Sequence, residues 1–349
     1  GNAKHEPGAV VCRVAPSFTR FGSFQIFASR GEIDVLRQLV DYTIRTDFSH
    51  LKEPSKEVYL EWFEEVCQKT LSMVLHWERV GFVHGVMNTD NMSILGLTID
   101  YGPYGWLEDY DPNWTPNTTD AGGRRYRFGN QSEIGLWNLV QLAQAIYPLI
   151  EAVEPLEAIL EKYKKDHVSG WRAMMAQKLG FKQYNQDSDG ELIAELLQVL
   201  QLAETDMTLF FRNLAQFDVA SLSLESISNE DLMKPLMEAY YLPQELGVDE
   251  KVRITNWIRQ YISRLADDGD THENRCSRMN AVNPKYVLRN YLAQLAIDKS
   301  EQGDHSLVNE LLEVLRNPYE EQPGKESFAE KRPEWARNRP GCSTLSCSS

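Results

Sequence analysis

The residues best suited to chemistry lie in two short segments, His84–Asn91 and Asp100–Gly102. Asn91 follows His84 by seven positions, and the acid Asp100 comes after a short apolar stretch. Asn and Asp side chains supply hard oxygen ligands of the kind that Mg²⁺ takes, and Mg²⁺ in turn binds phosphates. The pattern therefore predicts a nucleotide and Mg²⁺ site in which Asn91 and Asp100 are metal ligands.

The same segments resemble the active site of protein kinases, in which a catalytic loop H-R-D-x-x-x-x-N precedes D-F-G. His84-Gly-Val-Met-Asn-Thr-Asp-Asn91 keeps the spacing from His to Asn, and Asp100-Tyr-Gly keeps the metal-binding acid. Val86 replaces the kinase base, so ordinary protein phosphorylation is not expected. Asp90 is the nearest acid, and it either accepts a proton from a hydroxyl nucleophile or only supports the site. His84 is expected to hold the loop together.

Two arginines, Arg13 and Arg20, surround Pro16 in an aromatic segment just before the first predicted helix. A guanidinium is always charged, and its N–H groups fork onto phosphate oxygens. A lone pair of arginines is most commonly a surface feature. The aromatic surroundings of this pair favour a phosphate-binding role.

The three arginines of Arg124-Arg-Tyr-Arg-Phe128 form a basic patch in an otherwise acidic chain. The patch either binds nucleotide phosphates, binds an acidic substrate, or ties its own loop to acids. The acids considered for the last role are Glu108, Asp109 and Asp111. The sequence leaves these three alternatives open.

The composition limits the partners. The chain has 349 residues, with 51 acidic and 36 basic side chains and a net charge of −15. This charge argues against a general nucleic-acid surface and against binding to anionic membranes, so neither partner is expected. A hydrophobic fraction of 42% with eight Trp residues indicates a packed core. No apolar run is long enough for a transmembrane helix.

The first third of the chain mixes predicted strands and helices. Residues 9–14 are rich in Val and predict a strand, and the aromatic residues 18–24 predict a turn. Apolar spacing predicts one helix from Gly31 to Ile44 and another over Val58–Val80, which Gly81 ends. The apolar stretch 92–99 predicts a strand or a tight hairpin.

The remainder is predicted to be a long loop followed by helices. Residues 102–131 are rich in Gly, Pro, Asn and Asp, and a connection of that length indicates a functional loop. Further helices are predicted over 133–147, 150–165, 167–178, 191–203, 205–214, 229–240, 249–265, 283–298 and 304–316.

The five cysteines are too few and too scattered for a disulfide scaffold. Cys67 falls on an amphipathic helix and is expected in the core. Cys342 and Cys347 lie in a small, polar C-terminal tail in which nothing apolar demands them.

Six motifs are informative when they are taken together. They are Val14-Ala-Pro-Ser-Phe-Thr-Arg-Phe-Gly-Ser-Phe24, His84–Ser93, Asp100–Leu107, Trp137-Asn-Leu139, Met279–Tyr291 and the final Cys347-Ser-Ser. In these motifs the chain resembles the selenoprotein O pseudokinases. The resemblance covers essentially the whole chain, and its tail is similar to the animal form, in which selenocysteine occupies the third-last position, here Cys347.

The resemblance implies an atypical kinase fold that binds ATP and Mg²⁺ and transfers AMP to Ser, Thr or Tyr hydroxyls of proteins. Residue by residue, Asp90 is implied as the proton acceptor, and Asn91 and Asp100 as Mg²⁺ ligands. Asp100, Arg13 and Arg20 are implied to contact the nucleotide. Family members act in mitochondria or bacteria with a link to redox control, which implies a mitochondrial location here.

The expected fold class is therefore α+β and mostly helical, a kinase-like C-lobe with appended helices. Residues 1–30 are expected to be the end of an N-lobe and hinge, and 31–349 the C-lobe with a helical extension and redox tail. Most of the N-lobe is expected to be missing, since the chain lacks an initiator Met, a Gly-rich loop and a phosphate-pairing Lys. The alternative function is an inert, truncated pseudokinase that binds proteins.

A redox couple is a further expectation. Bacterial members of the resembled family carry a Cys in the loop after D-Y-G that pairs with a tail Cys, whereas Pro116 occupies that region here. Cys342 and Cys347 are the candidates for a substitute couple.

Overall fold

The computed structural model describes residues 10–339 and 341–342. In this part of the chain helices predominate, and a small antiparallel sheet joins β1 (Phe82–Val83) to β2 (Gly105–Trp106). The expected mostly helical α+β class is confirmed. No helix among the described residues is both long enough and apolar enough to cross a membrane.

Two of the predicted N-terminal helices are present. They are α2 (Ile33–Asp47) and α3 (Lys56–Val80). The Ser55 hydroxyl caps α3 by accepting a hydrogen bond from the Val58 amide, and Gly81 ends the helix in the left-handed region at φ 73°. The predicted end of this helix at Gly81 is confirmed.

The two predictions for the N-terminal segment were wrong. Residues 18–24 are not a turn, because Phe21–Ser29 forms helix α1, whose Phe21 and Phe24 are fully buried. Their spacing of three places both rings on one helix face, against the core. Residues 10–14 are not a strand, and Val10 and Val14 are almost fully exposed. β-branched residues favour a strand only where a neighbouring strand pairs with them.

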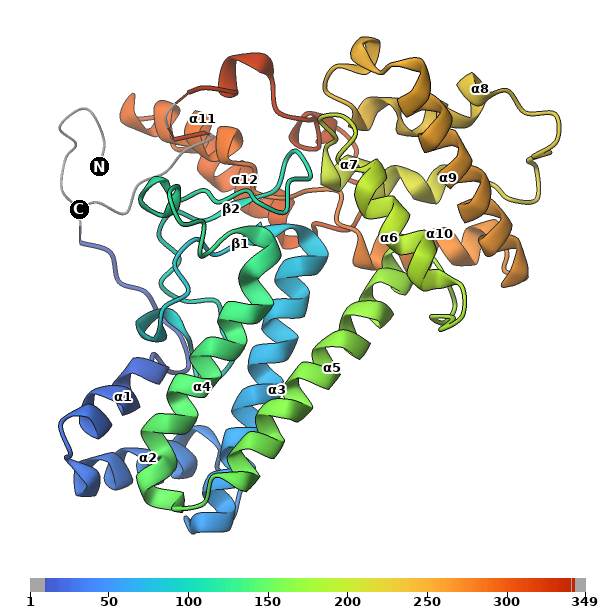
Figure 1. Cartoon of the computed structure of the whole chain (residues 1–349). Helices are drawn as coiled ribbons and strands as arrows, with labels where there is room; N and C mark the ends of the chain where they lie inside the picture. The colour runs from blue at the N-terminus through green and yellow to red at the C-terminus, as the bar shows by residue number, and fades with distance from the viewer. Residues whose placement is uncertain (1–9, 340, 343–349) are drawn as a thin grey trace.

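The middle of the chain forms a bundle. Helices α3, α4 (Gln131–Ile150) and α5 (Glu154–Lys178) run along one another, and α5 leads away from the base of the bundle toward the C-terminal helices (Figure 1). The predicted break between 165 and 167 was wrong, because no Gly or Pro interrupts the chain there and α5 is continuous. The helix of 133–147 was correct in place and short at both ends.

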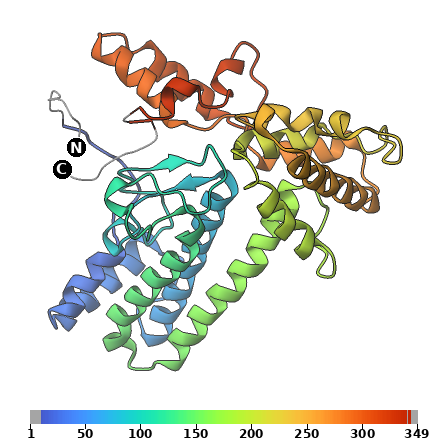
Figure 2. The same cartoon turned by 45° about the horizontal axis from the view of Figure 1, so that its top comes forward.

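The C-terminal half is a second group of helices, which Figure 2 shows beyond the end of the bundle. The predicted helices of 191–203, 205–214, 249–265 and 304–316 are confirmed with small shifts of their ends. The observed elements are α6 (Asp189–Val199), α7 (Met207–Asn213), α8 (Asn229–Met233), α9 (Val248–Asp267), α10 (His272–Val282), α11 (Asn290–Glu301) and α12 (Ser306–Arg316).

Two helix predictions in this half need correction. The helix of 229–240 is the short α8 followed by 3₁₀ turns over Lys234–Ala239, because Pro235 cannot donate to an α-helical ladder. The helix of 283–298 begins only at Asn290, and α10 before it was missed. Helix α10 is mostly polar and buries only Arg275 and Met279, so apolar spacing gave no signal.

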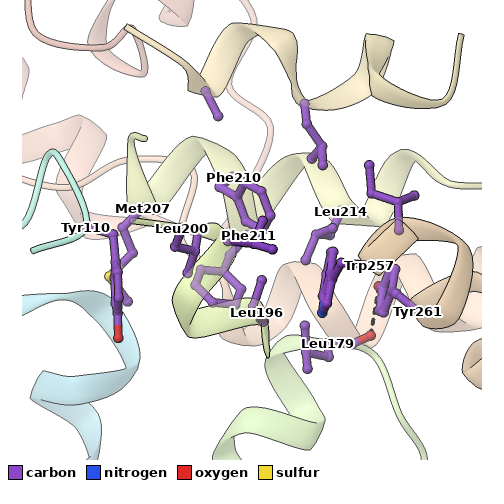
Figure 3. Close-up of a cluster of buried hydrophobic side chains, with 14 of the residues drawn as sticks. Tyr110, Leu179, Leu196, Leu200, Met207, Phe210, Phe211, Leu214, Trp257 and Tyr261 are labelled. Atoms are coloured by element: carbon purple, nitrogen blue, oxygen red, sulfur yellow. Dashed lines mark hydrogen bonds between the residues drawn. The ribbon is translucent and has the colours of Figure 1, made fainter. Parts of the chain in front are cut away.

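The core of the C-terminal half is aromatic. Trp257 and Tyr261, one turn apart on α9, stack with ring centroids 5.2 Å apart and an interplanar angle of 7°. The Tyr261 hydroxyl donates to the Leu179 carbonyl at 2.9 Å, so this core is tied to the end of α5 (Figure 3).

A buried ion pair joins the start of α7 to the segment before α11. The Arg289 guanidinium donates to both carboxylate oxygens of Asp206 at 2.7 and 3.0 Å, and both side chains are at most 1% exposed. Asp206 also caps α7 by accepting from the Leu209 amide and accepts from the Tyr241 hydroxyl. The charge is therefore fully paired, as a buried charge must be.

A second group of ion pairs lies close enough to Asp206 and Arg289 to interact with them electrostatically. Arg332, near the C-terminus, pairs with Glu108 at 3.1 Å and with Glu204 at 2.7 Å. Burial nevertheless raises the pKa of Glu108 to about 7, and it outweighs the opposing effects of Arg289 and Arg332. Repulsion by Asp206 adds to the rise.

This raised pKa predicts a pH-dependent stability. Because the folded pKa is about 7 and the ordinary value is 4.5, the folded state favours protonated Glu108. The stability that this group contributes is therefore lost as pH rises from the ordinary value to the folded one. Relative to Glu108→Gln, the free energy of unfolding of the native chain should fall over this window by up to ~3 kcal/mol. Urea unfolding at several pH values measures it.

Glu225→Gln is the matched control, because Glu225 is exposed. Its difference from the native chain should stay flat over the same pH window. A flat difference for Glu108→Gln as well would contradict the prediction.

Candidate functional site

The candidate site lies where the backbone of residues 19–21 pairs with the backbone of residues 92–94. The Phe21 amide donates to the Met92 carbonyl at 3.0 Å, and the Ile94 amide donates to the Thr19 carbonyl at 3.3 Å. A further bridge pairs Met92 with Thr98, so residues 92–98 form the tight hairpin that was predicted as one alternative for 92–99. These pairings place Arg20 beside a hairpin that Asn91 precedes and Asp100 follows.

Asp100 is the centre of this arrangement. Its backbone has φ 49°, a left-handed conformation that is uncommon for a residue with a side chain. The Arg20 Nε donates to Asp100 Oδ2 at 2.6 Å, and Arg13 Nη1 lies 3.5 Å from Asp100 Oδ1. The structure therefore brings together Arg13, Arg20 and Asp100, the three residues expected to contact the nucleotide. Their contact with a nucleotide stays a prediction.

The two arginines differ in how firmly they are held. The Arg20 side chain is one-third exposed, and Arg20 also forms the backbone bridge to Ser93. The Arg13 side chain is more than half exposed and lies over the Tyr101 ring, 5.8 Å from its centroid. Each guanidinium has five N–H donors, so pairing with Asp100 leaves donors for other anions.

Asn91 has its amide oriented for ligation. Its Nδ2 donates to the Val86 carbonyl at 2.8 Å, which turns Oδ1 the other way. Among the described residues nothing donates to that oxygen, so it is available to a cation. An Asn oxygen and a carboxylate at the ends of one hairpin fit Mg²⁺, which uses few protein ligands and completes its shell with phosphate and water.

No group of three or more His, Cys, Asp or Glu side chains that could hold a metal ion occurs in the described part of the chain, at this site or away from it. The predicted Mg²⁺ ligands, one Asn and one Asp, stay a prediction that this observation does not test.

Asp90 lies against the first turn of α1. Its side chain is exposed, and its backbone amide is held by Asn88 Oδ1 at 3.1 Å. A Cβ atom placed on Gly22 would lie only 2.0 Å from Asp90 Oδ1. The carboxylate can occupy this position because residue 22 has no side chain. The exposed carboxylate is free to meet a hydroxyl from solvent.

His84 is structural, as expected. It is fully buried, and its Nε2 lies 2.8 Å from the Ile99 carbonyl. A carbonyl only accepts, so Nε2 carries the proton, and Nδ1 is left to accept from the Val86 amide at 3.4 Å. Burial lowers the pKa of the ring, which keeps it neutral in this role.

Two buried amides on α4 support the loop, and the sequence reasoning missed both. Gln131 donates to the Phe82 carbonyl at 2.8 Å and accepts from the His84 amide at 3.1 Å. Asn138 donates to the Met87 carbonyl at 2.8 Å. The signal was available, because the two amides are seven residues apart and so share the one face of the helix that is otherwise apolar.

The long loop after Asp100 contacts the segment His84–Asn91 at Gly85. Gly85, at φ 81°, lies so close to the Pro103 carbonyl that a Cβ atom would be 2.4 Å from its oxygen. The buried Asn117 donates to the Gly85 carbonyl at 3.2 Å. Residues 102–131 are a long connection, as predicted, although β2 and several buried side chains make part of it core.

One alternative for the basic patch was wrong. In the described residues no arginine of the patch forms an ion pair with the acids considered for it. Glu108 pairs with Arg332, Asp109 accepts from the Thr205 amide, and Asp111 accepts from the Asn113 amide.

The surroundings of Cys342 differ from the expectation. The residue is 2% exposed and packs in a hydrophobic cluster with the residues of α11 and α12. Burial raises the pKa of its thiol. Its partner in the predicted redox couple, Cys347, lies outside the described residues, so the couple stays a prediction. Cys67 is buried, as expected.

Comparison with known proteins gives a consistent result. The family model of protein adenylyltransferase SelO matches residues 2–316. Proteins named protein nucleotidyltransferase YdiU from Rhodopirellula baltica and Aromatoleum aromaticum are 59% and 54% identical to the chain, over its whole length. A third, from Flavobacterium johnsoniae, is 52% identical. The chain spans 65–66% of the length of these relatives.

The α4 amides generate a stability prediction. Gln131→Leu keeps the size of the side chain and leaves the Phe82 carbonyl and the His84 amide buried without a partner. The free energy of unfolding, measured in urea, should fall by about 2–4 kcal/mol. Gln144→Leu is the control, because Gln144 is exposed on the same helix and its side chain forms no hydrogen bond with the described residues, and it should cost no more than ~0.5 kcal/mol. Equal losses in the two variants would contradict the supporting role of Gln131.

Proposed function

Because the chain belongs to the protein adenylyltransferase SelO family, we propose that it transfers AMP from ATP to Ser, Thr or Tyr hydroxyls of proteins. The bond between the α- and β-phosphates breaks, the hydroxyl oxygen bonds to the α-phosphorus, and pyrophosphate leaves. The observation that carries the proposal is the convergence of Arg13 and Arg20 on Asp100, at one end of the hairpin whose other end follows Asn91 and the exposed Asp90.

Each residue has a role in that reaction. Arg13 and Arg20 bind phosphate oxygens with the donors that Asp100 leaves available, which is bidentate recognition of the kind that favours Arg. Asn91 Oδ1 and the Asp100 carboxylate would hold Mg²⁺, which would supply positive charge against the phosphate oxygens.

Asp90 accepts the proton of the attacking hydroxyl. Its exposure and its place beside the hairpin allow a substrate side chain to approach it. The alternative, in which Asp90 only supports the site, is separated from this role by the substitutions below.

We also propose that the fold is a kinase-like C-lobe with appended helices. The support is local: a loop with the kinase spacing from His84 to Asn91, a buried His, and a hairpin leading to Asp-Tyr-Gly. The redox couple of Cys342 and Cys347, the mitochondrial location and the animal-like tail remain proposals carried by the resemblance alone.

Intact-mass spectrometry tests the transfer. The chain is incubated with ATP, Mg²⁺ and a hydroxyl-bearing acidic protein, and the mass of one AMP should appear on the chain or on its substrate. Asp100→Ala should abolish the gain because it removes a metal ligand and the partner of both arginines. Asp90→Asn should lower the rate by about 10²–10⁴-fold if Asp90 is the general base.

The matched control is Asp34→Asn, an exposed acid in the first turn of α2. It should leave the transfer unchanged. No AMP gain and no ATP-dependent rise in melting temperature would overturn the proposal for this chain and favour an inert protein-binding module.

Gly22→Ala gives a sharper test of Asp90. The added Cβ displaces only the end of the flexible Asp90 side chain, so the free energy of unfolding should change by less than ~1 kcal/mol. AMP transfer should fall at least ~10-fold because the proton acceptor has moved.

Gly190→Ala is the matched control, since Gly190 also follows the first residue of its helix and a Cβ there would meet only the Tyr184 hydroxyl at 3.2 Å. Unchanged transfer in Gly22→Ala would argue that Asp90 is not the proton acceptor.

A further inference from the structure

The basic patch is exposed and unpaired. Arg124 and Arg125 are exposed and Arg127 is half-buried. Within the described part of the chain none of them forms an ion pair with a carboxylate, although the sequence has 51 acidic residues. Three guanidinium groups without an acidic partner, on a chain of charge −15, make a local positive surface in a negative field.

The patch is also held in a fixed shape. The Asp120 carboxylate accepts from the Arg125 and Tyr126 amides, each at 2.8 Å, and from the Thr115 hydroxyl at 3.3 Å. The Asp120 carboxylate therefore stabilises the backbone of the loop and forms no ion pair with a guanidinium among the described residues. Arg124 takes a left-handed backbone with φ 46°, which is unusual for a residue with a side chain.

Aromatic rings orient one guanidinium of the patch. The Arg125 guanidinium lies over the Trp137 ring at 4.5 Å and over the Tyr126 ring at 5.7 Å from their centroids. Such contacts keep the charge and leave the N–H edges to other acceptors. Trp137 is 40% exposed, so the stack lies at the surface.

The patch is linked to the proposed proton acceptor through α4. The Trp137 ring contacts the Arg125 guanidinium. The next residue, Asn138, donates a hydrogen bond to the Met87 carbonyl in the segment His84–Asn91. One turn after Trp137, Gln141 accepts from Gln25 Nε2 at 3.1 Å. Gln25 Oε1 accepts from the hydroxyl of Thr89, the neighbour of Asp90, at 2.8 Å.

We propose that Arg124, Arg125 and Arg127 form a docking surface for an acidic segment of the protein substrate, next to the hydroxyl that is modified. The inference rests on the proposed AMP transfer and names its substrate class. The nucleotide alternative is disfavoured because Arg13 and Arg20, which converge on Asp100, already supply the arginines for phosphate.

A peptide-binding measurement tests the surface without requiring catalysis. The probe is a fluorescein-labelled peptide with a central Ser flanked by Glu and Asp, titrated with the chain and read by fluorescence anisotropy. Arg124→Glu with Arg127→Glu should raise its Kd at least tenfold. The native Kd should rise with salt, because exposed charges are screened. Arg124→Lys with Arg127→Lys should restore most of the binding, since the charge returns.

The matched control reverses two exposed lysines away from the patch, Lys52→Glu with Lys251→Glu, and changes the net charge by the same amount. Its Kd should stay within threefold of the native value, and melting temperatures should show that all variants are folded. Equal weakening by both pairs would overturn the proposal, because it would show a general charge effect.

Two further outcomes separate this inference from the proposed function. Loss of ATP binding in Arg124→Glu with Arg127→Glu, with peptide binding intact, would assign the patch to the nucleotide and overturn the inference. Peptide binding that depends on the patch, in a chain that transfers no AMP, would support the docking surface and contradict the proposed function.

Discussion

The site depends on how the buried backbone of residues 82–88 obtains its hydrogen-bond partners. This backbone runs through the protein interior with only a two-residue strand, so most of its N–H and carbonyl groups lack regular partners. A buried backbone group without a partner is costly, and side chains must therefore supply the missing bonds. Gln131 and Asn138 of α4 do so from one side, and Asn117 does so from the long loop. Helix α4 thus fixes the path of the loop on which Asp90 and Asn91 stand.

The charge of Asp100 is balanced by a partly exposed ion pair. Asp100 is the hairpin acid, and Arg20 neutralises it from a segment that is itself paired to the hairpin backbone. The ion pair is partly exposed, so it contributes little to stability. Its value is positional, because it holds a carboxylate and a guanidinium at the same end of the hairpin. The buried pair of Asp206 and Arg289 has the opposite character, since it is excluded from water and joins distant segments of the fold.

The sequence predicted features that depend on local chemistry or periodic spacing. Helix α3 follows from apolar spacing, and its end follows from Gly81. The roles of the site residues follow from the types of side chain that hold a cation, and they stay predictions. The pairing of Asp206 with Arg289 joins residues 83 positions apart and leaves no periodic signal. Helix α10 was missed because its stability comes from tertiary contacts of Arg275 and Met279 rather than from an apolar stripe. Residues 10–14 show the opposite case, because their composition favours a strand but no strand of the described part of the chain pairs with them.

Helix α4 connects these features in one physical argument. Its inward face carries the amides that hold the loop, and its exposed Trp137 carries Arg125 through cation–π contact. Adjacent residues on a helix point about 100° apart, so Trp137 and Asn138 necessarily serve different surfaces at the same height along the axis. Any displacement of α4 would move the loop and the basic patch together. The distance between a docked acidic segment and Asp90 is therefore set by one rigid helix, which is the requirement for a surface that positions a hydroxyl for reaction.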